Sequence, residues 1–584
     1  MNPQQKTSPE LSQALALLRP YFKRAFWFSI VASLLVLAPT GFMLEVYDRV
    51  VNSRSLATLV MLIVLVVGAY VVMELLEWAR GQIMFAAGLA LDRELGDRIF
   101  MAMFAANLRR LPGGTTQPMG DFRILREFLH SPVVLALMES PVSLVLMVLI
   151  FAASPVLGWA AVIGAVVQVF VGWLNEKATQ PPLVAATRSA AGAQQYADGV
   201  LRNAQVIEAM GMQRDIHRRW IDKQREFLDL QAFASDKAGG YQAITKFLQT
   251  TMGSLLLGLG AWLLLSNELR GGSGMMIVAS VLGGRMLAPL VQIVTQWRNV
   301  VAVRDSWGRL NQLLSFVPPP VKAMPLPQPK GFLLAESVTA AAPGSPVPIL
   351  KGVAFALKPG EVLAVVGPSA SGKTTLARTL VGLWPSAGGK VRLDGADVFA
   401  WDKAELGPSI GYLPQDVELF DGTIAENIAR FGDPEPAKVH AAAQAVGLDE
   451  FIQALPQGYD SPVGREGAML SGGQRQRVGL ARAIYGDPVF VVLDEPNSSL
   501  DDAGDQALAA AVLDLKARGT TFVVMTHRTS ILPVVDKMLV LRDGQAQAFG
   551  GRDEVLAALN KAAAQAQQAS QPRAPGQAQV PATA

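Results

Sequence analysis

The sequence predicts a multi-domain membrane protein, in which a six-helix, all-α transmembrane domain is followed by an α/β domain built around a phosphate-binding loop. Three observations lead to this prediction. Long uncharged runs crowd residues 25 to 297, residues 330 to 560 have the mixed composition of an ordinary α/β domain, and a Gly-rich loop lies at Gly367–Thr375. The 584 residues are 51% hydrophobic and only 17% charged, so the apolar residues are concentrated in the first half of the chain.

Composition excludes several classes of function. The net charge of +3 is small and the basic residues are scattered, which argues against a nucleic-acid partner. The chain has no cysteine, so it has no disulfide framework, no thiol nucleophile and no Cys-ligated metal, and its four histidines are isolated. The N-terminus is polar up to Arg24, and no small-residue cleavage site follows the first apolar run. That run is therefore expected to be a retained span and not a signal peptide.

Six runs are long enough, or nearly so, to cross a bilayer, which takes ~20 helical residues. The run Ser140–Leu174 contains no charge but is far too long for one span, so it is expected to fold back. Ser154–Pro155 is the expected break, because proline disfavours helical backbone in the residue before it. The predicted spans are about 25–44, 56–73, 131–153, 156–174, 247–266 and 271–297.

Basic residues gather in two of the connections between these spans. Residues 80–126 carry seven arginines and residues 176–246 a similar excess of Lys and Arg, whereas the other connections hold only Arg49, Arg54 and Arg270. Positive charge gathers on the cytoplasmic side of a membrane, so both termini and the phosphate-loop domain are expected there. Apolar residues recur at helical spacing in both basic connections, which predicts that the spans continue as helices beyond the membrane.

Four charged residues fall in or at the ends of the spans: Glu74, Glu77, Glu139 and Arg285. A charge there is costly unless it faces a cavity or a partner. The three glutamates either lie at the membrane interface or line a polar route. Arg285 lies deeper and is a candidate for a pathway or an interhelical contact.

Proline and polar residues mark the remaining boundaries. Pro318–Pro320 and Pro325–Pro329 predict a stiff linker, and the end of the chain turns to Ala, Gln and Pro with no core-forming residues. The predicted parts are an N-terminal segment 1–24, a transmembrane domain 25–316, a Pro-rich linker 317–330, a nucleotide-binding domain 331–560 and a disordered tail 561–584.

The Gly-rich loop fits the pattern Gly, four residues, Gly-Lys-Thr between a buried strand, Val362–Val366, and a helix-like segment. Backbone N–H groups of such a loop cradle phosphates at a helix N-terminus, Lys373 supplies charge to the outer phosphates, and the Thr374 hydroxyl is placed for Mg²⁺. The domain is therefore expected to be a P-loop nucleotide-binding domain. The loop residues expected to contact the nucleotide are Gly367, Pro368, Ser369, Ala370, Ser371, Gly372, Lys373, Thr374 and Thr375.

Two further stretches carry chemistry. Phe490–Glu495 reads as a buried strand ending in two carboxylates, of which Asp494 is positioned to hold Mg²⁺ and Glu495 to polarise an attacking water. Leu470–Gln474, Leu-Ser-Gly-Gly-Gln, opens a predicted helix and forms a second candidate anion site.

Together these motifs resemble those of the ATP-binding cassette transporters. The phosphate loop, Gln415, the signature Leu470–Gln474, Asp494 with Glu495, Ser499–Asp501 and His527 follow the order and spacing of that family throughout residues 330 to 560. The resemblance implies the fold of a type I ABC exporter. In that family the signature of one subunit closes over ATP on the phosphate loop of its partner, so a chain with one of each is expected to form a homodimer.

The same resemblance assigns roles to individual residues. Gln415 would contact Mg²⁺ and sense the membrane domain, Asp501 would link the two sites, and His527 would hold the γ-phosphate and orient Glu495 as the catalytic base. The signature residues that would contact ATP are Ser471, Gly472, Gly473 and Gln474.

The sequence departs from the family pattern in two places. The aromatic side chain that usually stacks on adenine is missing from Val338–Pro343, so adenine is expected to be held weakly or by other groups. A Gly-Glu-x-Gly-like element before the signature reads Gly464-Arg-Glu-Gly467, with the acid moved by one position, so an altered contact with the membrane domain is expected.

Over nearly the whole chain the resemblance is to type I secretion permease/ATPases. It is carried by Val46–Val50, Val206–Met212, Gly411–Phe420 and Leu493–Leu500. It implies ATP-driven export of an unfolded polypeptide with a C-terminal signal across the inner membrane of a Gram-negative bacterium. A periplasmic adaptor, or membrane fusion protein, and an outer-membrane channel would complete the conduit, and membrane lipid surrounds the spans. The first 24 residues are too short for the N-terminal peptidase domain of some relatives.

Two alternatives remain at this point. A lipid or drug exporter would share the architecture but would need no adaptor. A cassette-bearing regulator or repair ATPase without a transport role is disfavoured by the six predicted spans.

Overall fold

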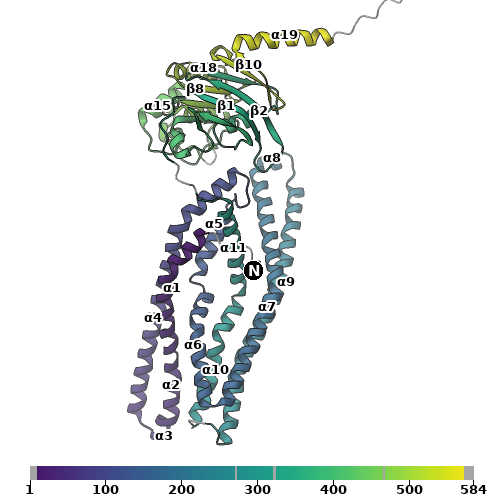
Figure 1. Cartoon of the computed structure of the whole chain (residues 1–584). Helices are drawn as coiled ribbons and strands as arrows, with labels where there is room; N and C mark the ends of the chain where they lie inside the picture. The colour runs from purple at the N-terminus through teal and green to yellow at the C-terminus, as the bar shows by residue number, and fades with distance from the viewer. Residues whose placement is uncertain (1–8, 270–271, 320–323, 465–466, 571–584) are drawn as a thin grey trace, which may run out of the picture. The chain divides into compact units, whose positions relative to one another are not determined.

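The computed structural model describes residues 9–269, 272–319, 324–464 and 467–570, and it divides into two compact units (Figure 1). The first unit comprises Met1–Asn107 and Leu111–Pro319, and the second comprises Leu108–Arg110 and Pro320–Ala584. The first is helical in its described part and the second contains all the described strands. The predicted fold class, helical spans followed by an α/β domain, is confirmed.

Helices account for the first unit, and six helical runs in its described part are long and apolar enough to cross a membrane. This confirms the predicted number of spans. The bounds are α1 (Pro9–Leu35), α2 (Leu37–Glu45), η1 (Val46–Val50, a π-helix), α3 (Val51–Ser53), α4 (Leu56–Leu108), α5 (Gln117–Phe128), α6 (Pro132–Ala153), α7 (Pro155–Arg202), α8 (Ala204–Ala209), α9 (Gln213–Leu265), α10 (Gly272–Thr295) and α11 (Trp297–Phe316).

The break between spans three and four lies at Ser154–Pro155, as predicted. Ser154 is extended, with φ −163° and ψ 136°, and its hydroxyl accepts a hydrogen bond from the Val156 N–H at 3.3 Å. The first span differs from the prediction of one helix over 25–44, because α1 ends at Leu35 and α2 begins at Leu37. Pro39 has no N–H to donate to the Leu35 carbonyl, which accounts for the interruption.

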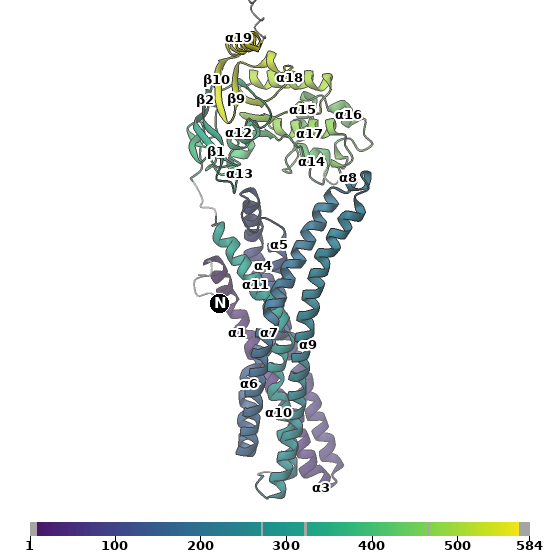
Figure 2. The same cartoon turned by 90° about the vertical axis from the view of Figure 1, so that its right-hand side faces the viewer.

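Both basic connections are helical. Helices α7 and α9 contain 48 and 53 residues, which at ~1.5 Å per residue is more than twice the ~30 Å hydrocarbon thickness. The two helices lie side by side along their length and are joined by α8 (Figure 2). Small residues allow close packing, since a Cβ added at Gly164 of α7 would lie 1.9 Å from the Met252 side chain of α9.

The second unit contains two sheets. A four-stranded antiparallel sheet has the order β2-β1-β4-β5, and a six-stranded sheet has the order β10-β9-β3-β8-β7-β6, with all neighbours parallel except β10 and β9. The strands are β1 (Leu333–Ala341), β2 (Pro348–Leu357), β3 (Val362–Val366), β4 (Gly388–Leu393), β5 (Ala396–Asp397), β6 (Ile410–Leu413), β7 (Phe490–Asp494), β8 (Thr521–Met525), β9 (Lys537–Arg542) and β10 (Gln545–Gly551). The helices are α12 (Lys373–Leu380), α13 (Lys403–Leu406), α14 (Ile424–Ile428), α15 (Pro436–Ala445), α16 (Asp449–Gln453), α17 (Gly472–Ile484), α18 (Asp502–Ala517) and α19 (Arg552–Ser570), with 3₁₀ turns at η2 (Gly407–Ser409), η3 (Gly458–Asp460) and η5 (Leu532–Val534).

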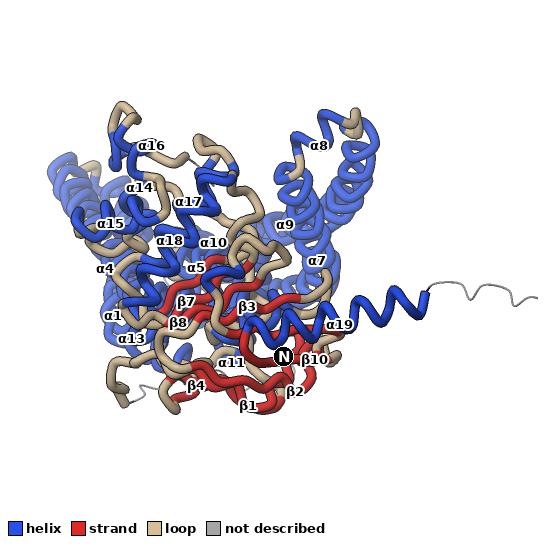
Figure 3. Tube along the Cα trace, turned by 90° about the horizontal axis from the view of Figure 1, so that it is seen from above, coloured by secondary structure: helices blue, strands red, loops and turns tan. Residues whose placement is uncertain are grey.

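The six-stranded sheet is buried on both faces, because successive side chains of a strand point to opposite sides. In β3, Leu363 and Val365 join a core that contains the four-stranded sheet and α12, whereas Val362 and Ala364 join a core that contains α15, α17 and α18. Figure 3 shows β1, β2 and β4 on one side of the six-stranded sheet and the latter helices on the other. Helices α12 and α17 therefore pack against opposite faces of one sheet.

The end of the chain corrects one expectation. Helix α19 continues to Ser570, so the disorder predicted from residue 561 is wrong as far as that residue. Alanine and glutamine have high intrinsic helix propensity, which explains why a stretch without core-forming residues extends a helix. The rest of the predicted tail, 571–584, lies outside the described residues.

Candidate nucleotide-binding site

The phosphate loop connects β3 to α12, and its backbone admits only small residues at two positions. A Cβ added at Gly367 would lie 2.2 Å from the Leu541 carbonyl oxygen. Gly372 precedes α12 with φ +102°, a left-handed conformation that favours glycine, and Ala370 also has a positive φ of 63°. The loop is thus held in a tight curve that ends at the N-terminus of α12.

A buried ammonium group occupies this curve. Lys373 is the first residue of α12 and is 8% exposed. Its Nζ donates hydrogen bonds to the carbonyls of Gly367 at 2.8 Å and Pro368 at 3.1 Å. The Ser371 hydroxyl is buried without a hydrogen-bond partner in the described part of the chain. Lysine, hydroxyl and helix N-terminus together suit an anion with several oxygen atoms.

Asp494 ends β7 and is almost fully buried, at 1% exposure. Neither of its carboxylate oxygens has a hydrogen-bond partner among the residues that the structure describes. Burial raises the pKa of Asp494, and the nearby Thr374 hydroxyl acts in the opposite direction. A buried carboxylate without a partner is unfavourable, and a hard divalent cation would relieve it. The oxygen donors of Asp494 and Thr374 therefore fit Mg²⁺.

Glu495 follows directly and is brought together with two other predicted residues. Gln415 Nε2 lies 3.4 Å from Glu495 Oε2, and His527 Nδ1 lies 3.6 Å from Glu495 Oε1. The three side chains follow β6, β7 and β8, three neighbouring parallel strands whose carboxyl ends share one edge of the sheet. Glu495 has φ +50°, which is unusual for a residue other than glycine, and its N–H bonds to the Met525 carbonyl at 3.0 Å. This backbone holds the carboxylate at the sheet edge, where it can accept a proton from water.

The signature residues form a reciprocal cap at the start of α17. The Gln474 N–H donates to the Ser471 hydroxyl at 3.3 Å, and the Ser471 N–H donates to the Gln474 side chain at 2.8 Å. Within the described chain, no hydrogen bond or ion pair joins Ser471–Gln474 to Gly367–Thr375. Since α12 and α17 lie on opposite faces of the sheet, the two predicted anion sites do not share a contact within one chain.

Asp501 caps α18, where its carboxylate accepts a hydrogen bond from the Gly504 N–H at 2.9 Å. It also pairs with the Arg477 guanidinium of α17. The Gly504 hydrogen bond, followed by Arg477, holds the pKa of Asp501 below its ordinary value. Asp501 thereby connects α18 to the signature helix.

The structure adds one residue, Gln476, that the sequence motifs do not predict for this site. Gln476 is 4% exposed and its Nε2 donates to the Glu495 carbonyl at 3.2 Å and the Ser498 hydroxyl at 3.2 Å, while its Oε1 accepts from the Ser499 N–H at 2.8 Å. It ties the signature helix to the segment after β7. A polar residue on the face of α17 that carries Leu480 was the available signal, because that face is otherwise apolar.

The structure describes in full only one of the two places where the sequence departs from the family pattern. Val338 and Ala340 lie in β1 and are buried, so this stretch contributes to the core of the domain. The displaced acid of Gly464–Gly467 is Glu466, which lies outside the described residues.

Of the charged residues predicted in the spans, some form ion pairs in the described chain and others do not. Glu139 pairs with Arg80 at 2.7 Å, and Arg80 also donates to the Ser29 hydroxyl at 3.3 Å. The sequence places Arg80 in a basic connection, but the structure shows it buried within α4. Glu74 and Arg285 are exposed and form no ion pair within the part of the chain that the structure describes.

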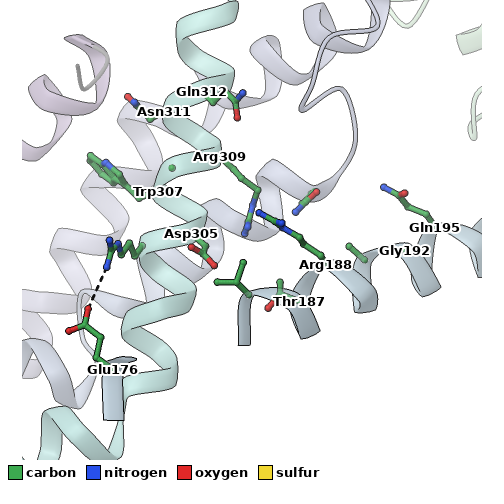
Figure 4. A pocket seen from close by; sticks show the side chains of 15 residues that line it. Glu176, Thr187, Arg188, Gly192, Gln195, Asp305, Trp307, Arg309, Asn311 and Gln312 are labelled. Atoms are coloured by element: carbon green, nitrogen blue, oxygen red, sulfur yellow. Dashed lines mark ion pairs between the residues drawn. The ribbon is translucent and has the colours of Figure 1, made fainter. Parts of the chain in front are cut away.

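A polar cavity of about 1130 Å³ lies within the helical unit, between α5, α7 and α11. Arg188 of α7 and Arg309 of α11 reach into it (Figure 4), and Glu176 pairs with Arg304 across it at 3.7 Å. Arg309 is itself held by Asp121, with its Nε 2.8 Å from one carboxylate oxygen. The cavity therefore offers charges of both signs beyond the apolar spans.

Comparison with known families matches both units. Residues 350–498 match the ABC transporter family, and residues 25–286 match the ABC transporter transmembrane region. A solved structure of a bacterial Atm1-family ABC exporter with ATP bound has the same fold, with a TM-score of 0.81 over 96% of this chain and 100% of that chain at 21% identity.

Two relatives match the chain through both units. The type I secretion system ATP-binding protein PrsD of Rhizobium meliloti is 40% identical over 90% of this chain and 91% of its own length. The toxin RTX-I translocation ATP-binding protein of Actinobacillus pleuropneumoniae is 28% identical over 93% of this chain and 77% of its own. An ATP-dependent lipid A-core flippase of Burkholderia orbicola is 39% identical over only 40% of this chain and 39% of its own.

Proposed function

Since the chain belongs to the type I secretion group of ABC transporters, we propose that it exports an unfolded polypeptide bearing a C-terminal signal across the inner membrane of a Gram-negative bacterium. The protein is a multi-pass membrane protein that couples ATP hydrolysis to transport. One observation carries the proposal: the match to a type I secretion ATP-binding protein, 40% identical overall, covers 90% of this chain and so includes residues of both units.

In the proposed reaction the loop Gly367–Thr375 holds the ATP phosphates, with Lys373 against the outer ones. Thr374, Gln415 and Asp494 would hold Mg²⁺, which when bound neutralises charge on the β- and γ-phosphates. Glu495 accepts a proton from the attacking water, and His527 orients the Glu495 carboxylate and holds the γ-phosphate. The 3.4 Å and 3.6 Å contacts of Glu495 with Gln415 and His527 support this assignment.

The active form is proposed to be a homodimer in which Ser471–Gln474 of one protomer close over ATP on the partner's phosphate loop. The placement of α12 and α17 on opposite faces of the sheet supports this, because one chain alone does not bring its two anion sites together. Asp501, held between α17 and α18, would transmit closure from one site to the other. Closure and release would reach the spans through helix tips near Pro118–Leu129 and Asn203–Gln213.

The proposed cargo path includes the polar cavity between α7 and α11. An unfolded polypeptide presents backbone amides and charges of both signs, and the cavity offers Arg188, Asp305 and the Glu176–Arg304 pair. A periplasmic adaptor and an outer-membrane channel are the proposed partners that continue the path. The alternative is a lipid or drug exporter, which the flippase similarity favours only for a part of the chain.

Purified dimer reconstituted in lipid nanodiscs distinguishes the two functions. A C-terminal segment of a candidate secreted protein is expected to stimulate ATP hydrolysis several-fold, whereas the same residues in scrambled order are not. Arg188→Glu, which changes the cavity but not the nucleotide site, should weaken this stimulation and leave the basal rate unchanged. Stimulation by lipid A or by drugs, without any response to the peptide, would overturn the proposal.

A further inference from the structure

An apolar pocket of about 650 Å³ lies in the helical unit, between α1, α4, α5, α6 and α11. Its wall is formed by Phe22 and Phe26 of α1, Leu137 and Met138 of α6, and Trp307 of α11, together with further aliphatic side chains. Such a wall offers almost no hydrogen-bond partner to a polar ligand. It suits a hydrocarbon chain.

Positive charge without a partner lies beside this pocket. Lys23 is the one charged residue that lines it among the described residues, and its side chain is exposed. Arg19, one helical turn earlier, and Arg24, the next residue, are exposed as well. None of these three cations forms an ion pair or a hydrogen bond in the described chain. The pocket therefore combines an apolar interior with a cationic rim.

The rim lies at the level where the spans begin. Lys23 is two residues before the uncharged run that starts at Ala25, and on α6 the residues from Ser131 to Met138 are also uncharged. Trp27 on α1 is 65% exposed, and tryptophan is enriched at membrane–water interfaces. Lys23 is thus at headgroup depth. Phe26, Leu137 and Met138 extend the pocket into the hydrocarbon region, whereas its other end, with Leu91 and Trp307, lies beyond the predicted spans.

The geometry points to a binding site for an anionic glycerophospholipid of the surrounding bilayer. One acyl chain fills the pocket, and the headgroup phosphate pairs with Lys23, with Arg19 adding positive charge. Trp307 also lines the polar cavity, so the bound lipid contacts α11, the helix that forms one wall of that cavity. The site does not depend on the identity of the cargo.

The test is lipid retention by the full-length protein, measured by native mass spectrometry after exchange into phosphatidylglycerol or phosphatidylcholine. The wild type is expected to retain phosphatidylglycerol in preference. Lys23→Glu should weaken phosphatidylglycerol retention by about tenfold and leave phosphatidylcholine unaffected, because it reverses a charge at the headgroup. Leu137→Trp should reduce retention of both lipids, since the larger side chain fills the mouth of the pocket, where Leu137 is 54% exposed.

Lys246→Glu is the matched control. Lys246 is exposed, forms no ion pair within the described residues, and directly precedes the uncharged run of α9, but it lines no part of the pocket. Its variant should retain both lipids as the wild type does. Wild-type retention by both Lys23→Glu and Leu137→Trp would overturn the proposal. So would retention of a cargo C-terminal segment, and of no lipid, through Lys23, because the occupant would then be a polypeptide.

Discussion

Buried charges are treated differently in the two units of this protein. In the α/β unit the Asp494 carboxylate is buried with neither oxygen hydrogen-bonded in the described chain, and the Ser371 hydroxyl of the phosphate loop is also buried without a partner there. In the helical unit the buried side chains of Arg80 and Asp121 are paired, with Glu139 and Arg309. An unpartnered buried carboxylate marks a place where a cation would supply the missing contacts, whereas internal ion pairs hold helices together. Substitutions in the two units should therefore differ in kind.

The largest effect is expected from Glu495→Gln. The substitution preserves the shape of the side chain but removes the proton acceptor, so ATP turnover should fall by at least about 100-fold while ATP binding is retained. Steady-state ATPase activity and fluorescent-nucleotide binding measure the two effects. The matched control is Glu450→Gln, an exposed glutamate on α16. Full turnover in the Glu495 variant would remove it from the role of catalytic base.

Glu139→Gln tests whether a buried ion pair stabilises the helical unit. It leaves the buried Arg80 guanidinium without its carboxylate, which should cost about 3 kcal/mol of stability. Thermal unfolding in detergent should show a lower midpoint, while nucleotide affinity stays unchanged. Glu127→Gln, on the exposed side of α5 and without an ion pair in the described chain, should have no such effect. Equal midpoints for both variants would mean that the Arg80–Glu139 pair does not stabilise the unit.

Asp494→Asn should change stability in the opposite direction. Because burial raises the pKa of Asp494, the folded state binds a proton more tightly than the unfolded chain, and this stabilisation is lost as the pH rises through the raised pKa. At neutral pH the amide removes a buried charge, so the nucleotide-free protein should gain about 1 kcal/mol or more while Mg²⁺-dependent ATP binding weakens. Thermal unfolding with and without Mg²⁺ and ATP measures both effects. If the variant were less stable than the wild type without ligand, the Asp494 carboxylate would not be a destabilising group that a bound cation relieves.

The smallest effect is expected from Ser471→Ala. It removes the side-chain acceptor of the cap on α17 and should cost about 1 kcal/mol of stability. If Ser471 also contacts ATP on the partner protomer, turnover should fall by more than this loss explains. Ser386→Ala, which removes a hydroxyl from a surface loop of the same domain, controls for loss of any serine side chain. A loss of stability with unchanged turnover would mean that Ser471 only caps α17 and does not contact ATP.

The parts of the site that the sequence predicts are those encoded by local pattern. The strand over 362–366 begins and ends at the predicted residues, because a short apolar run bounded by a charged residue and a glycine specifies a buried parallel strand. Contacts between residues that are distant in the sequence cannot be predicted from local pattern. Gln476 is one example, because its role depends on the carbonyl of Glu495, which lies on another element. The Arg80–Glu139 pair is a second, since Arg80 resembles any other basic residue near the end of a span.

The arrangement of α12 and α17 on opposite faces of one sheet has a consequence for the life of the protein in the cell. Each subunit carries both elements of the proposed nucleotide pocket, but within one chain they lie on opposite faces of the sheet. With the homodimer proposed above as the active form, a newly inserted subunit hydrolyses no ATP until it meets a second copy.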